Sequence, residues 1–169
     1  MNLDLILSRR SIRRYKPEPV PEEAIEAMLR AAMSAPSAGN GQPWRFVVLD
    51  DRRLLDEIPR FHPHAQMLKE APAAILVCAA AGEARYAGKY WVQDCAAATE
   101  NILLAAHVLG LGAVWLGVYP EEARMEGLRK LLAIPGEIVP FALVAVGHPA
   151  ERQPPAERYD PGRVHRNRW

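Results

Sequence analysis

Four arginines lie within eight residues near the N-terminus, in the segment Ser-Arg-Arg-Ser-Ile-Arg-Arg-Tyr at positions 8–15. They are Arg9, Arg10, Arg13 and Arg14, in a chain whose formal net charge is only +1. A guanidinium group binds phosphate through a planar fork of N–H donors, and Ser11 adds a hydroxyl. A solvated basic face is the alternative interpretation, because charge runs are common on surfaces. The cluster therefore indicates either an anion site or a surface patch.

A second polar segment, residues 35–45, has the composition of a loop. It contains two glycines and two prolines, which favour turns, together with hydrogen-bonding side chains at Ser37, Asn40 and Gln42. The sequence therefore predicts a loop that carries several hydrogen-bonding side chains.

The elements around the arginine cluster predict its setting. Apolar residues recur at helical spacing over residues 3–7, with Asn2 available as an N-cap. Three prolines between residues 17 and 21 prevent a helix from continuing. The arginines therefore lie where a short helix gives way to an extended segment. If that segment is a strand, Arg9, Ser11 and Arg13 share one side.

The rest of the chain alternates between periodic and apolar segments. Apolar stripes predict helices over residues 21–34, 52–59, 91–109 and 120–132. Short apolar runs predict strands over residues 46–49, 73–79, 113–118 and 141–146. Helices and strands mix without strict βαβ alternation, so we expect an α+β fold in which helices cover a sheet.

Two segments suggest contact beyond the core. From Cys95 onward, the helix at 91–109 is apolar nearly all the way round, which suggests burial against a second subunit. Residues 148–169 are proline-rich and basic, yet they include Tyr159 and Trp169. A disordered tail has little use for such aromatic residues, so we expect an extended arm that packs on the body or on a partner subunit.

Composition excludes several classes of protein. With 169 residues, half of them hydrophobic, the chain can form one domain with a substantial core. Its 21 basic residues balance 20 acidic ones, which argues against a nucleic-acid partner. Cys78 and Cys95 lie in apolar surroundings and are expected to be buried thiols. Without a signal core or a long apolar run, we expect a cytoplasmic protein with no membrane partner.

Single motifs give no catalytic or metal site. Gly110 and Gly112, followed by Gly117, miss the spacing of a dinucleotide-binding loop. His62 and His64 lie in a proline-flanked loop and are interpreted as a surface pair, not as metal ligands. We therefore predict no metal site and no catalytic side chain.

The segments taken together are more specific. The order is residues 9–13, then Pro-Ser-Ala-Gly-Asn-Gly-Gln-Pro-Trp at 36–44, then Gly-Leu-Gly-Ala-Val-Trp-Leu-Gly at 110–117, and finally a basic arm around Arg158. In this order the chain resembles the nitroreductase family of FMN-dependent NAD(P)H oxidoreductases. The resemblance implies a single FMN-binding domain over residues 1–169, with 148–169 as its arm. It also implies a central mixed or antiparallel sheet of four to five strands, in a homodimer with swapped arms.

The resemblance also implies which residues hold the flavin. Its phosphate, ribityl chain and ring oxygen are expected at Arg9, Arg10, Ser11 and Arg13. The loop residues expected to reach a flavin of the same or the partner subunit are Pro36, Ser37, Asn40 and Gln42. Backbone N–H groups near Leu116 and Gly117 are expected to face flavin N5. Arg158 is expected to close on the phosphate, with Arg163 as a second choice.

The implied reaction is ping-pong. NADH or NADPH passes hydride to flavin N5, and the flavin then reduces a small-molecule acceptor such as a nitroaromatic or a quinone. A cation at Arg13 stabilises the negative charge of the reduced ring. Trp44, Trp91 and Trp115 could wall an aromatic pocket, although core packing explains Trp44 and Trp115 as well. Alternatives are other flavin chemistry, such as dehalogenation or flavin degradation, and a non-catalytic dimer that binds FMN or another polyanion.

Overall fold

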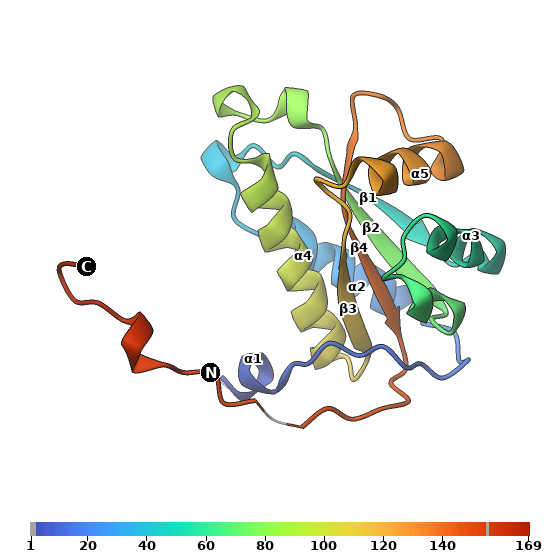
Figure 1. Ribbon diagram of the computed structural model, residues 1–169, viewed down its shortest axis with the longest axis horizontal. Helices are drawn as coiled ribbons and strands as arrows, with labels where there is room; N and C mark the ends of the chain where they lie inside the picture. The colour runs from blue at the N-terminus through green and yellow to red at the C-terminus, as the bar shows by residue number, and fades with distance from the viewer. Residues whose placement is uncertain (1–2, 155) are drawn as a thin grey trace.

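A four-stranded antiparallel sheet forms the centre of the protein (Figure 1). The computed structural model describes residues 3–154 and 156–169. Its strands are β1 (Trp44–Leu49), β2 (Ala73–Ala79), β3 (Gly112–Gly117) and β4 (Val139–Gly147), in the spatial order β1-β2-β4-β3. The predicted α+β class is confirmed, and of the two predicted sheet types the antiparallel one is found.

Helices cover both faces of this sheet (Figure 1). One layer consists of α2 (Glu22–Met33) and α4 (Trp91–Val108), and the other contains α3 (Arg52–Glu57) and α5 (Glu122–Leu132). The short α1 (Asp4–Ser8) lies beside the end of α4. None of the helices in the described ranges is long and apolar enough to cross a membrane.

Two-sided covering explains the continuous apolar strands. Ile75 and Val144 face the α2–α4 layer, whereas Leu76 and Leu143 face the α3–α5 layer. All four side chains are fully buried. Alternate residues of a strand point to opposite faces, so a strand with helices on both sides must be apolar at nearly every position.

The long helix α4 buries one side and leaves the other half open. Cys95, Ala98 and Ile102 are fully buried against the sheet and α2, and the Asn101 amide donates to the Ala31 carbonyl at 2.9 Å. At the end of the helix Val108 is 60% exposed. Many of the apolar residues of α4 thus pack within the chain itself. Burial of this helix against a partner subunit remains a prediction.

The N-terminal segment is less regular than the sequence suggests. Asn2, the predicted N-cap, lies outside the described residues. After α1, the segment forms one parallel bridge, Ser11 to Ala113, and an antiparallel bridge, Tyr15 to Pro149, but no strand.

The C-terminal arm follows the body and then leaves it (Figure 1). Ala150 donates its backbone N–H to the Arg14 carbonyl at 2.9 Å, and Arg10 Nε donates to the Pro154 carbonyl at 3.0 Å. Farther along, His165 stacks on Trp169 with ring centroids 4.3 Å apart, and Trp169 is fully exposed. The start of the arm therefore packs on its own chain, whereas the exposed Trp169 stacks on His165 of the same arm.

The contact between α5 and Phe61 gives a stability prediction. A Cβ at Gly127 would collide with the Phe61 ring. Replacing glycine by alanine inside a helix gains about 1 kcal/mol of propensity, but overpacking typically costs about 1–3 kcal/mol. We therefore expect Gly127→Ala to lower the urea midpoint of unfolding. Gly136→Ala is the control, because nothing lies within 4 Å of its Cβ position. An increase in stability for Gly127→Ala would contradict the contact.

Candidate functional site

The arginine-rich segment 8–15 crosses the end of the sheet where β3 begins and β4 ends. Ile12 donates its N–H to the Ala113 carbonyl at 3.0 Å, and the Tyr15 hydroxyl donates to the Ala145 carbonyl at 3.2 Å. Two glycines permit this close crossing. A Cβ at Gly112 would lie 2.6 Å from the Ile12 side chain, and one at Gly147 would lie 3.0 Å from the Tyr15 ring.

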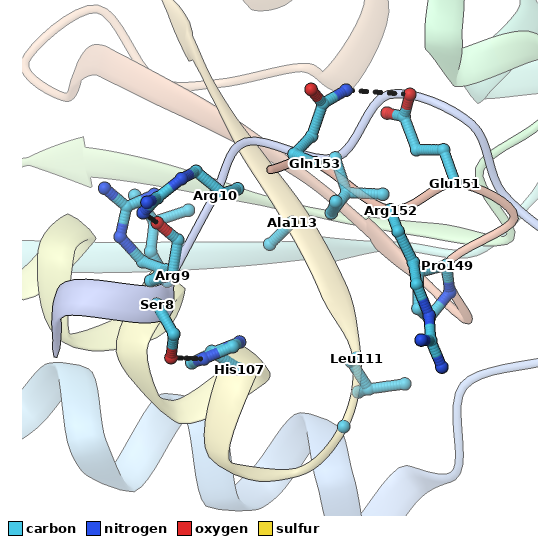
Figure 2. A pocket seen from close by; sticks show the side chains of 13 residues that line it. Ser8, Arg9, Arg10, His107, Leu111, Ala113, Pro149, Glu151, Arg152 and Gln153 are labelled. Carbon is cyan, nitrogen blue, oxygen red and sulfur yellow. Dashed lines mark hydrogen bonds between the residues drawn. The ribbon is translucent and has the colours of Figure 1, made fainter. Parts of the chain in front are cut away.

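A cavity of about 300 Å³ opens beside this crossing (Figure 2). Its wall is formed by the end of α1, the end of α4, the start of β3 and residues 149–153 of the arm. Arg9, Arg10 and Arg152 bring positive charge to it, and Glu151 brings one negative charge. Ser8 Oγ and His107 Nε2, 2.8 Å apart, lie at the same wall.

Arg10 uses most of its donors on the protein itself. Its Nη1 donates to the carbonyls of Leu7 and Arg9 at 2.7 and 2.6 Å, and its Nε donates to Pro154. Its Nη2 is buried and has no partner among the described residues. A buried donor without an acceptor is costly, so this atom marks a place where an anionic ligand would restore a hydrogen bond.

Arg9 is less engaged than Arg10. Its Nε lies 3.3 Å from the Glu100 carboxylate, and its side chain is 20% exposed. A second hollow of about 350 Å³ adjoins the first, sharing Arg9 and Arg10 and adding Arg158. The structure thus brings three of the predicted phosphate ligands together. Arg163, the second choice, is paired with Asp160 at 3.1 Å and lines neither hollow.

Two other predicted residues lie outside the cavity wall. Ser11 lies in the backbone bridge to Ala113, and Arg13 donates its backbone N–H to Glu151 Oε1 at 2.6 Å. Arg152, which lines the cavity, was not singled out by the sequence. It would have been found only by recognising that the arm folds back along residues 13–16.

The loop with Ser37, Asn40 and Gln42 lies at the opposite end of α4 (Figure 1). The Ala38 N–H donates to Asp94 Oδ1 at 2.9 Å, in the first turn of that helix. Asn40 and Gln42 have φ angles of 55° and 48°, so their backbones are left-handed. Pro36, the first residue of this loop, is exposed.

The helix sets the separation of the two predicted regions. Eighteen residues of α-helix span about 27 Å. The arginine cavity adjoins His107 near the end of α4, whereas the loop adjoins Asp94 near its beginning. A single chain therefore does not bring the two regions into one pocket.

Gly117 ends β3 at the free edge of the sheet. Backbone groups along an edge strand point alternately to the neighbouring strand and to the open side. Ala113 directs its carbonyl outward to Ile12. Gly117 lies four residues farther along the strand, and because the direction repeats every second residue, its N–H also points outward. Leu116 directs its N–H to β4. A Cβ at Gly117 would have nothing within 4 Å, so a planar ligand could approach this edge.

Aromatic side chains flank this end of β3. The Trp91 ring packs edge-on against the rings of Tyr119 and Phe141, with centroids 4.8 and 5.9 Å apart. The Trp115 ring packs against Phe141 in the same way, with centroids 5.8 Å apart. Trp44, in contrast, is buried in the core, as the packing interpretation predicted. Among the polar side chains of the segment before β2, Gln66 is exposed and donates to the Pro63 carbonyl in its own loop.

The interpretation of His62 as a surface residue is wrong. Its side chain is fully buried beneath α5, and Nε2 lies 3.0 Å from the Gly117 carbonyl oxygen. His64 remains exposed. No local pattern distinguishes the two, because tertiary packing alone decides which of them faces inward. No group of three metal-ligating side chains occurs in the described ranges.

His62 predicts a loss of stability in acid. Burial and the Arg124 guanidinium lower the pKa of His62 below the ordinary 6.5, against the opposing effect of the Gly117 carbonyl. Below pH 6.5 the unfolded chain takes up a proton that the folded protein excludes. The stability tied to neutral His62 is therefore present above pH 6.5 and is lost as the pH falls toward the lower pKa of the folded state.

The test compares His62→Gln with wild type. The free energy of unfolding, measured in urea between about pH 7.5 and pH 5.5, should decline less for the variant. His64→Gln should keep most of the wild-type decline, because it leaves His62 buried and removes only one of the smaller causes that lower the pKa of His62. Equal declines in all three proteins would show that His62 takes up protons freely in the folded state.

Comparison with known proteins identifies the family of this chain. The chain matches the Nitroreductase family over residues 6–65 and 62–148. It is 51% identical over 170 residues to a candidate NADH dehydrogenase/NAD(P)H nitroreductase of Archaeoglobus fulgidus, covering 99% of this chain and 98% of that protein. A candidate nitroreductase of Desulfovibrio desulfuricans, solved in complex with FMN, superposes with a TM-score of 0.84 at 35% identity, covering 99% and 96% of the two chains. The chain therefore belongs to the Nitroreductase family and is an oxidoreductase of that family.

Proposed function

We propose that this protein binds FMN and uses it to pass hydride from NADH or NADPH to a small oxidised acceptor, such as a quinone or a nitroaromatic compound. The observation that carries this proposal is the meeting of Arg9, Arg10 and Arg158 at two adjoining hollows. FMN supplies the redox chemistry when it is bound, so the protein has to bind it, orient it and control access to it.

The residues present fit the phosphate of FMN. A phosphomonoester carries nearly two negative charges near pH 7 and three strong acceptor oxygens. Arg9 has N–H donors beyond its contact with Glu100, and Arg10 Nη2 is a buried donor without a partner. Arg158 adds a third cation from the arm. These groups neutralise a phosphate and hold it by charge-assisted hydrogen bonds.

The free edge of β3 fits the ring of FMN. The outward N–H of Gly117 is a donor on an open edge, and the lack of a Cβ leaves room for a flat ring. Half-buried Trp91 and Trp115 lie beside it and would shield the ring from water. Arg13 remains our choice for the cation that opposes negative charge on the ring.

We further propose a homodimer with swapped arms. The loop of Ser37, Asn40 and Gln42 leads into β1, at the opposite edge of the sheet from β3, so a flavin lying along β3 would receive this loop from the other subunit. Exposed apolar side chains support this arrangement, because Leu7 and Val108 are 66% and 60% exposed. A second copy would bury them.

The first test measures FMN binding and its reduction. Protein mixed with FMN should lose the visible flavin absorbance when NADH or NADPH is added without oxygen, and it should regain it when a quinone follows. Arg9→Ala should weaken FMN binding roughly 10- to 100-fold, because a charge-assisted hydrogen bond is worth about 1.5–3 kcal/mol. Arg163→Ala is the matched control, since Arg163 is paired with Asp160. Equal losses in both variants, or flavin that neither nucleotide reduces, would contradict the proposal.

The second test asks whether two subunits build each site. Arg9→Ala and the double variant Asn40→Gly/Gln42→Gly should each bind FMN poorly as homodimers. Glycine keeps the left-handed backbone at both loop positions. Co-expressed subunits form mixed dimers with one intact site each, so binding should return to on the order of a quarter of all sites. In the control, the two variants are purified separately and then mixed under conditions that prevent subunit exchange, so that no mixed dimers form. Without any recovery on co-expression, the two regions would not share a site.

A further inference from the structure

Two side chains converge on one backbone carbonyl at the end of β3. His62 Nε2 lies 3.0 Å from the Gly117 oxygen, and Arg124 Nη1 donates to the same oxygen at 2.9 Å. They come from different elements, the turn that follows α3 and the helix α5. Neither residue lines the arginine cavity.

The chemistry of His62 fits a fixed donor. A carbonyl oxygen can only accept, so the proton of the neutral imidazole must be on Nε2. Burial and the nearby Arg124 lower the pKa of His62, which favours this neutral form. Nδ1 is then unprotonated, and it is buried without a partner among the described residues. A leucine would fill the same space without this orphan atom, so the contact with Gly117 is what the imidazole provides.

The hydrogen bonds limit the motion of the most flexible residue at this edge. Glycine has the widest range of backbone conformations, and Gly117 is exposed. Its carbonyl is held from two sides, and the N–H groups of the next two residues, Val118 and Tyr119, both donate to the Phe141 carbonyl at 3.3 and 2.9 Å. The peptide that follows Gly117 is therefore fixed. The preceding peptide, which carries the Gly117 N–H, is held on its other side by the pairing of Leu116 with Leu143 of β4, so this N–H keeps one direction.

We propose that His62 and Arg124 are positioning residues that hold Gly117 so that its N–H is aimed at the flavin ring. Arg124 also keeps a positive charge one hydrogen bond from this residue. Both effects stabilise the negative charge that a flavin gains on reduction, so both favour its reduced form. This inference rests on the proposed binding of FMN.

The test uses three substitutions at the two positions. Arg124→Met and His62→Leu remove the hydrogen bonds to Gly117, whereas His62→Gln can restore a donor through its Nε2 amide. The controls are His64→Leu and Lys130→Met, which change an exposed histidine and an exposed cation of α5. Arg124→Met keeps the test valid if His62→Leu fails to fold, because Arg124 is only half-buried.

Two readouts separate positioning from mere stabilisation. In the protein without FMN, hydrogen exchange of the Val118 and Tyr119 amides, which both donate to the Phe141 carbonyl, should be about tenfold faster by NMR in Arg124→Met and His62→Leu. With FMN, the ratio of reduced to oxidised flavin affinity should fall about tenfold, which is a midpoint potential about 30 mV lower for a two-electron couple. His62→Gln and both controls should stay near wild type in each readout.

The outcomes are distinguishable. If both hydrogen-bond variants lose thermal stability but keep the wild-type potential and the wild-type exchange of the Val118 and Tyr119 amides, the positioning role is wrong. If wild type itself does not bind FMN, the proposed function fails, and the flavin role of these residues fails with it. Faster exchange of these two amides together with an unchanged potential would show that the hydrogen bonds order the edge without tuning the flavin, and it would overturn the inference.

Discussion

The length of α4 is the constraint on which the arrangement of the site depends. The helix packs its buried side against the sheet and α2, so it cannot tilt away from the strands. Its first turn holds the loop of residues 36–42 through Asp94, and its last turn borders the arginine cavity through His107. The loop and the arginine cavity of one chain are therefore held apart. In the proposed homodimer, the loop that reaches a flavin would come from the other copy.

Glycines determine how closely other groups can approach both ends of β3. Gly112 and Gly147 let segment 8–15 lie directly on the end of the sheet, which brings Arg9 and Arg10 over the start of β3. Gly117 leaves the other end of β3 open. Strand β3 thus begins at a glycine that lies under Ile12 and ends at a glycine with open space beside it. The predicted phosphate site lies at the first position and the predicted ring site at the second.

Much of the fold could be predicted from the sequence because apolar periodicity is a local signal. Strand β2 was predicted with both boundaries right, and α4 and α5 to within two residues, since two-sided burial makes strands continuously apolar and helices striped. The bridge at Ser11 gave no such signal. Its pairing with Ala113 joins residues about a hundred positions apart, and no window of sequence contains both.

The site was predictable in its residue types and less so in its geometry. Arg9, Arg10 and Arg158 line one hollow, and their binding of a phosphate stays a prediction. Arg152 was not singled out and His62 was wrongly interpreted as a surface residue, because the return of the arm and the turn beneath α5 arise from tertiary packing. The sequence also could not show that Arg10 uses three donors on backbone carbonyls.

The C-terminal arm has a mechanical consequence. Arg158 and Trp169 lie on one continuous stretch without a strand or a long helix, and residues 154–169 can extend over about 50 Å. The arm is anchored at Pro154 by Arg10, and its aromatic end is bare. Because Arg158 lies between the Arg10 anchor and the bare end, a second copy that bound Trp169 in the proposed homodimer would also restrict the movement of Arg158.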